Sequence, residues 1–195
     1  MPYDAMNDRD DETLLAAYAA GDAAAARALT ARLTPRVLAH AYRMLGGDRA
    51  EAEDVTQEAL LRLWRAASEW RAGEAKVSTW LYRVTANLCI DRLRARRGNT
   101  DLDAIPEPED GAPSAIDGMQ AQARAEALQA ALMQLPDRQR QAVVLRHIEG
   151  LSNPEIAQIM DIGPRAVESL TARGKRALEA MLLGRRAELG FEDDG

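Results

Sequence analysis

Six polar or small residues near the C-terminus have the types and spacing of a surface that contacts DNA base pairs. Their intervals place them on one face of a helix: Arg165, Glu168, Ser169, Ala172, Arg173 and Arg176. Arginine can pair with guanine in the major groove, glutamate can accept a hydrogen bond from the cytosine amino group, and serine can donate or accept. A small alanine lets the backbone approach a thymine methyl group. This face therefore predicts direct contacts with base edges.

Two helices joined by a short turn must position these residues. The first spans residues 152–160, and Glu155 can form a capping box with Ser152 at its start. Residues 161–163 form the turn, and Pro164 suits the first position of the second helix. Apolar residues form the inward side of both helices: Ile156, Ile159, Met160, Ile162, Val167, Leu170, Leu178 and Leu182. This pattern predicts a helix-turn-helix, although a generic helical hairpin would show the same apolar stripe.

The charge of the chain is unevenly distributed. A net charge of −6 argues against a nucleic acid as partner. Residues 62–97, however, carry nine basic and three acidic side chains, and residues 164–186 carry six basic and two acidic ones. Because a polyanion is bound by a local positive field, the two basic stretches predict two nucleic-acid contacts. Each stretch taken alone is equally consistent with a solvated helix face.

The composition favours an all-α fold of two small helical domains. Aromatic residues make up only 4% of the chain, whereas alanine and leucine abound, which favours helices over a β-sandwich or barrel. Helical patterns run through residues 10–97 with short breaks, and Pro35 should end or kink the helix that contains it. Residues 98–122 contain three prolines, six acids and no base, which is typical of a flexible linker. We therefore expect domains at 1–97 and 123–184, an acidic linker at 98–122 and an acidic tail at 185–195, with the helix-turn-helix ending the second domain.

Several classes of function are excluded because the sequence lacks the motifs and residue types that they require. There is no Gly-rich phosphate loop and no plausible pair of nucleophile and base, so we expect neither an enzyme nor catalytic residues. One cysteine, Cys89, and two isolated histidines, His40 and His147, predict no metal site and no cofactor. No apolar run approaches the ~18 residues of a membrane span. The N-terminus is acidic and has no signal-peptide core. We expect a cytoplasmic protein without direct membrane insertion.

Three further segments carry a more specific pattern. Residues 51–65 read EAEDVTQEALLRLWR, residues 77–94 read VSTWLYRVTANLCIDRLR, and residues 135–152 read LPDRQRQAVVLRHIEGLS and lead into the helix-turn-helix. In this order they resemble the core-polymerase-binding segment, the promoter −10 segment and the −35-binding domain of bacterial RNA polymerase sigma factors. The resemblance is to the extracytoplasmic-function (ECF) group of the sigma-70 family. It covers roughly residues 11–97 and 124–183.

The resemblance implies a protein that binds core RNA polymerase, directs it to promoters through the −35 and −10 elements and promotes DNA opening. The implied polymerase partners are the clamp of the largest subunit and the flap. One helix face should dock on the clamp, and its residues are Asp54, Gln57, Glu58 and Arg65. The six residues of the helix-turn-helix should contact the −35 element. Glu168 stands where the family is often basic, which predicts an altered −35 preference, and Gly174 stands where alanine is usual.

The resemblance assigns five residues to single-stranded −10 DNA: Lys76, Trp80, Arg83, Asn87 and Arg92. The three cations can contact phosphates, and Asn87 occupies a position where the family has a base-reading asparagine. Trp80 can stack on a base, since aromatic side chains bind single strands in this way. The favoured interpretation, however, is a core residue beneath the base-binding pocket.

Further implied partners are promoter DNA and a dedicated anti-sigma factor, with the chain a monomer when it is free. Two alternatives stay open. A helix-turn-helix regulator of another kind would bind duplex DNA as a dimer, but it leaves residues 50–97 unexplained. A sigma-like helical adaptor would no longer initiate transcription, and Glu168 and the net negative charge keep this minor alternative open.

Overall fold

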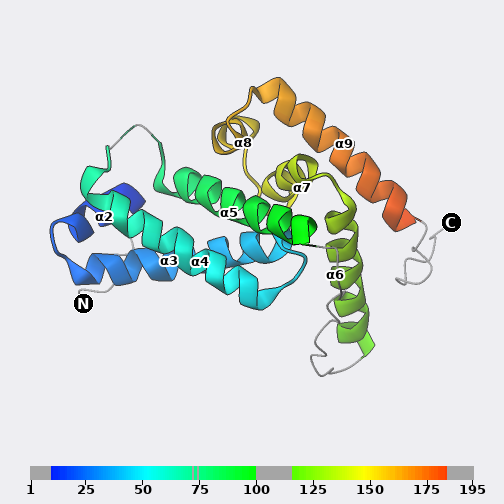
Figure 1. Ribbon diagram of the computed structural model, residues 1–195, viewed down its shortest axis with the longest axis horizontal. Helices are drawn as coiled ribbons and strands as arrows, with labels where there is room; N and C mark the ends of the chain where they lie inside the picture. Colours follow the sequence, from blue (N-terminus) through cyan, green and yellow to red (C-terminus); the bar gives the residue numbers. More distant parts are fainter. Residues whose placement is uncertain (1–9, 72, 74, 100–115, 184–195) are drawn as a thin grey trace.

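The computed structural model describes residues 10–71, 73, 75–99 and 116–183. All regular structure within them is helical, which confirms the all-α prediction (Figure 1). The N-terminal part contains α2 (Asp11–Ala19), α3 (Ala23–Met44), α4 (Arg49–Ala66), η1 (Ala67–Glu69) and α5 (Val77–Asn99). The C-terminal part contains α6 (Ile116–Gln134), α7 (Asp137–Val143), η2 (Val144–Ile148), α8 (Asn153–Met160) and α9 (Pro164–Leu183). Residues 100–115 of the predicted linker and the predicted tail lie outside the described residues.

Aspartates set the start of the first three helices. The carboxylates of Asp10, Asp22 and Asp48 accept hydrogen bonds from backbone N–H groups in the first turns of α2, α3 and α4, as N-cap residues do. Between α3 and α4 the chain turns at Gly46 and Gly47, whose φ values of 80° and 88° favour glycine. The apolar sides of α2 to α5 then meet in one buried core.

Two helices extend beyond the ends that the sequence suggested. The helix α3 passes through Pro35, which is exposed, while Leu33 and Val37 on either side are buried. Packing of that apolar side outweighs the one backbone hydrogen bond that proline removes. The helix α6 begins at Ile116, inside the segment predicted as linker. Alanine, glutamine and methionine after that point are good helix formers, which continue the helix toward the N-terminus.

The helix-turn-helix forms as predicted. The Glu155 carboxylate accepts hydrogen bonds from the Ser152 backbone N–H at 3.0 Å and from the Ser152 hydroxyl at 2.7 Å, so the capping box is present. Asp161 adopts a left-handed conformation with φ of 54°, and Pro164 is the first residue of α9. The inward residues Ile156 and Val167 are fully buried. The turn therefore sets the angle at which α9 leaves α8.

Gly174 lies where α9 crosses α7 closely. A Cβ atom there would lie 2.6 Å from Val143 Cγ2 and 3.3 Å from the Gln139 backbone oxygen. Valine has a stiff side chain, and a backbone oxygen cannot rotate away. The glycine is therefore required by packing, which offsets its cost in helix propensity.

We expect Gly174→Ala to lower the free energy of unfolding by about 1–2 kcal/mol, because overpacking outweighs the roughly 1 kcal/mol gain in helix propensity. Urea denaturation followed by circular dichroism measures this change. Adding Val143→Ala should recover part of the loss, since it removes the clashing methyl groups. A Gly174→Ala protein more stable than the parent would show that α7 and α9 separate easily.

The C-terminal part packs against the N-terminal part along α5 and α3. Tyr82 of α5 lies in an apolar cluster of the C-terminal part, together with Leu145 and Ile156. Conversely, Met133 of α6, in the C-terminal part, packs against the N-terminal core. Gln129 Nε2 also donates a hydrogen bond to the Arg43 backbone oxygen at 2.9 Å. We call this contact region, formed by α3 and α5 on one side and α6 to α8 on the other, the domain interface.

His40 is fully buried beside this interface. Its ring meets Tyr82 edge to face at 5.2 Å, and neither ring nitrogen has a hydrogen-bond partner among the described residues. Burial, followed by the positive charge of Arg43, lowers the pKa of His40 from 6.5 to about 3. The imidazole is therefore neutral in the folded protein at neutral pH.

We expect the free energy of unfolding to fall as the pH drops below 6.5, by about 1.4 kcal/mol per pH unit from this histidine. The reason is that the unfolded chain takes up a proton that the folded chain refuses until about pH 3. His40→Leu keeps an apolar side chain without a titrating group and should reduce the loss between pH 7 and pH 5. Urea denaturation at both pH values measures it, and equal losses in both proteins would reject His40 as the cause.

None of the helices in the described part of the chain is long and apolar enough to cross a membrane.

Candidate nucleic-acid interface

The predicted −35 face of α9 is open to solvent. All six of its residues are exposed: Arg165, Glu168, Ser169, Ala172, Arg173 and Arg176. Arg173 Nε donates to the Ser169 backbone oxygen at 3.2 Å, and Arg176 Nε donates to the Ala172 oxygen at 3.3 Å. Leu170 packs against the inner apolar cluster, as its spacing predicted. This face therefore presents three arginines, a carboxylate and a hydroxyl that can contact base edges in the major groove of a DNA duplex.

Four of the predicted −10 residues lie on one face of α5 and of the residue before it. Lys76, Trp80, Arg83 and Asn87 follow at intervals of four, three and four, the spacing of a single helix face. Lys76, Arg83 and Asn87 are exposed. Trp80 is half-buried against the N-terminal core, and its ring meets that of Trp70 at 5.8 Å and 82°. Trp80 therefore supports this face from the core side.

Two cations of this face are paired with the helix-turn-helix. Lys76 Nζ lies 3.2 Å from Glu155 Oε1, and Arg83 Nη2 lies 3.3 Å from Asp161 Oδ2. Hydrogen bonds from Ser152, and then from Lys76, hold the pKa of Glu155 below its ordinary value, so its carboxylate is charged. The positive face of α5 thus meets a negative edge of α8.

Arg92 is separated from the other four residues. It lies five positions after Asn87, a rotation of about 140° around the helix. Its guanidinium lies 4.0 Å from Asp54 Oδ2 and 3.8 Å from Glu58 Oε2, both on α4. Arg92 therefore faces α4 and the predicted polymerase dock, not the face that contains Lys76.

The predicted polymerase dock is an exposed face of α4. Asp54, Gln57 and Arg65 are exposed, and the partly exposed Glu58 accepts a hydrogen bond from Arg62 at 2.6 Å. Sequence reasoning missed Leu61, which lies in the middle of this face by its spacing and is 52% exposed. An apolar residue at the centre of a polar helix face was the available signal. A face with an apolar centre and a polar rim suits protein binding.

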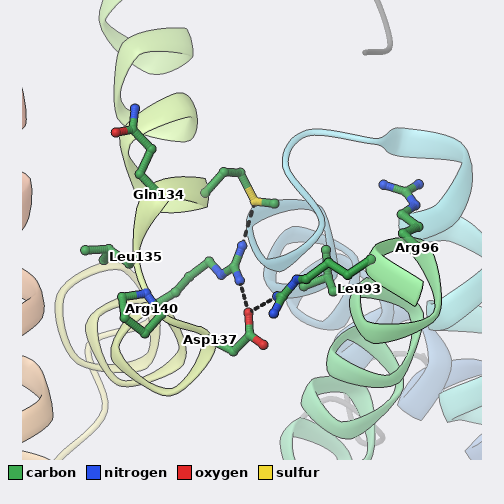
Figure 2. A pocket seen from close by; sticks show the side chains of 9 residues that line it. Leu93, Arg96, Gln134, Leu135, Asp137 and Arg140 are labelled. Carbon is green, nitrogen blue, oxygen red and sulfur yellow. Dashed lines mark hydrogen bonds and ion pairs between the residues drawn. The ribbon is translucent and has the colours of Figure 1, made fainter. Parts of the chain in front are cut away.

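The C-terminal end of α5 is also tied into ion pairs. Arg96 Nη2 lies 2.6 Å from Asp48 Oδ2 and 3.0 Å from Glu51 Oε2. Arg97 Nη2 lies 2.6 Å from Asp137 Oδ1, and Asp137 also pairs with the buried Arg140 (Figure 2). Figure 2 shows the pocket where these side chains of α5 and α7 meet. This end of α5 therefore joins the two parts of the protein.

Among the described residues, no group of three His, Cys, Asp or Glu side chains is placed to hold a metal ion. Cys89 is buried, and burial raises the pKa of its thiol to about 12, so it is not a reactive thiolate.

Comparison with known proteins places both parts in one family. Residues 29–98 match the model of sigma-70 region 2, and residues 125–178 match the model of sigma-70 region 4. The chain is 38% identical over 157 residues to the ECF RNA polymerase sigma factor SigE of Mycolicibacterium smegmatis, over 78% of this chain and 60% of that relative. It is 36% identical over 182 residues to the ECF RNA polymerase sigma factor SigM of Mycobacterium tuberculosis, over 93% of this chain and 89% of that relative.

Among solved structures, the fold is similar to that of CnrH in complex with the cytosolic domain of CnrY. The TM-score is 0.66 at 27% sequence identity, and the match covers 89% of this chain and 97% of CnrH.

Proposed function

The chain belongs to the ECF group of sigma-70 family RNA polymerase sigma factors, and on that premise we propose which of its faces carries each step of initiation. An ECF sigma factor directs RNA polymerase to promoters and is not an enzyme. The observation that carries the assignment of faces is that one chain presents two basic helix faces, on α5 and α9, beside a polar dock on α4. We assign polymerase binding and −10 recognition to residues up to 99, and −35 recognition to residues 116–183.

Polymerase binding falls to the α4 face. Asp54 and Glu58 offer carboxylates to a basic partner surface, such as the clamp of the largest subunit, while Leu61 supplies a central apolar contact. Gln57 and Arg65 complete the rim. Arg92 holds Asp54 and Glu58 in place from α5, so its role lies with the dock.

We assign binding of the −10 element to the face formed by Lys76, Arg83 and Asn87. The two cations contact phosphates, and Asn87 hydrogen-bonds to an unpaired base, while Trp80 supports this face from the core side. The six exposed residues of α9 contact the −35 element in duplex DNA. A pocketed base offsets the unpairing cost of a few kcal/mol, which promotes opening.

Run-off transcription with purified bacterial core RNA polymerase and a library of genomic promoter fragments tests this function. Discrete transcripts that require the added chain support it, and their upstream sequences give both elements. Stable core binding without transcripts would favour the adaptor. Neither binding nor transcripts would favour a helix-turn-helix regulator of another kind.

We expect Asn87→Ala to reduce open-complex formation about 5- to 150-fold, the effect of losing a base contact worth about 1–3 kcal/mol. Permanganate footprinting of the melted region measures opening, and core binding should not change. Ser78→Ala, also on α5 but on another side, is the matched control. Normal opening by the Asn87 variant would reject its role.

An anti-sigma factor is the proposed regulatory partner. The similar protein CnrH is found in complex with the cytosolic domain of CnrY. Such a partner would act on this chain in the cytoplasm and would cover the faces that bind polymerase and DNA. Without partners, we propose that the chain is a monomer.

A further inference from the structure

We propose that in the free protein the helix-turn-helix domain blocks the −10 face of α5, with α8 as an intramolecular competitor of promoter DNA. The inference rests on the proposed −10 role of Lys76 and Arg83. It concerns the chain alone and requires no second protein.

The first observation is that the cations of the −10 face are already occupied. Glu155 and Asp161 lie at the start and end of α8, and their carboxylates contact Lys76 and Arg83 at 3.2 and 3.3 Å. A DNA phosphate contacting either cation would compete with the carboxylate there. Because both kinds of anion are attracted to the same two cations, docking of α8 and binding of single-stranded DNA weaken each other.

The second observation is that an aromatic side chain of α5 is buried by the docked domain. Tyr82 is 7% exposed and lies in the apolar cluster of the helix-turn-helix domain. Its hydroxyl donates a hydrogen bond to Glu149 Oε2 at 3.1 Å, and Arg43 Nη1 lies 3.5 Å from the other Glu149 oxygen. Tyr82 therefore anchors the docked domain beside the two ion pairs.

The balance of these contacts permits release. Both ion pairs are largely exposed, and exposed ion pairs contribute little and weaken with salt. Tyr82 and Glu149 add a buried ring and a hydrogen-bonded carboxylate. Met133, Gln129 and the Arg97–Asp137 pair hold the two parts together farther from the −10 face. Core polymerase that binds the α4 face, together with a promoter strand that binds Lys76 and Arg83, then competes with this docking.

Zero-length carbodiimide cross-linking of the full chain tests the docking directly. The chain has only two lysines, Lys76 and Lys175, so the possible products are few. We expect a Lys76–Glu155 amide within the monomer, identified by mass spectrometry, and its loss when core polymerase and a promoter fragment are added. The Lys175–Glu179 pair, 3.7 Å apart within α9, is the internal control and should form in both samples. If only the control amide forms in the free chain, the proposal is overturned.

A double variant, Asp161→Asn with Glu149→Gln, tests whether weaker docking improves DNA binding, and we call it the release variant. Asp161→Asn removes one carboxylate and tolerates the left-handed backbone there. Glu149→Gln keeps an acceptor for Tyr82 without the charge. The matched control, Glu126→Gln with Glu179→Gln, removes the same charge from exposed sites on α6 and α9. The probe is the fluorescent non-template −10 strand of a promoter found by run-off transcription.

We expect the release variant to bind this strand about fivefold more tightly than the parent, because apparent affinity scales with the open fraction. An equal gain in the control would reduce the effect to net charge and overturn the proposal. Different results would contradict the docking proposal and the proposed function. Transcription without a Lys76–Glu155 amide removes the docking alone, whereas the amide without transcription removes the assigned function and leaves the docking in place.

Discussion

Replacing Asp137 with asparagine is expected to lower the free energy of unfolding by about 3 kcal/mol, because it leaves a buried guanidinium without a counter-charge. Arg140 is 1% exposed, and Asp137 is its ion-pair partner (Figure 2). Arg140 Nη1 also contacts Met133 Sδ, and Arg140 Nε has no hydrogen-bond partner among the described residues. Burial lowers the pKa of Arg140 below its ordinary value, and the charge of Asp137 and its hydrogen bond oppose that shift.

Urea denaturation of the full chain measures the loss, and Asp54→Asn, at an exposed site, is the matched control with an expected change below about 0.5 kcal/mol. Arg140→Met removes the charge and keeps an unbranched chain in the same space. Adding Asp137→Asn to Arg140→Met should then cost little more, since no unpaired charge remains. A full further loss in the double variant would assign the effect to the Asp137–Arg97 pair instead.

The helix-turn-helix could be predicted from the sequence because its signals are local. Ser152 and Glu155 are three residues apart, and Pro164 suits the first position of a helix, where its missing N–H costs nothing. Arg140 could not be predicted as buried, since its neighbours are polar and nothing local shows that α5 and α6 cover it. Gly174 is required by α7, which lies about 30 residues earlier in the chain.

In the candidate site, too, some features follow from local sequence spacing and others depend on contacts between distant residues. The spacing of Lys76, Arg83 and Asn87 predicts one helix face, and the same rule applied to Arg92 places it elsewhere, as its ion pairs with α4 show. The contact between Lys76 and Glu155 joins residues 79 positions apart, so no periodicity reveals it. Family resemblance does not reveal it either, because it assigns each face a partner outside the chain.

Arg173→Ala is the second large effect, and we expect it to weaken holoenzyme binding to a promoter by about 1–3 kcal/mol if the arginine contacts a base. Arg173 is exposed in the middle of the −35 face, and its Nε alone is used for the bond to the Ser169 oxygen. Its fork of donors suits the O6 and N7 atoms of guanine. Fluorescence anisotropy with a labelled promoter duplex measures the affinity.

Lys175→Ala is the control that separates base contact from general attraction. It removes the same charge from the same helix, but it lies two residues on, on the other side of α9, where it pairs with Glu179. A base contact predicts that Arg173→Ala relaxes the sequence preference at one −35 position and leaves the salt dependence nearly unchanged. A phosphate contact predicts a uniform loss over all sequences and a salt slope smaller by about one. Equal losses in the two variants would reduce Arg173 to a contributor to the positive field and shift the reading of the −35 element to Glu168 and Arg165.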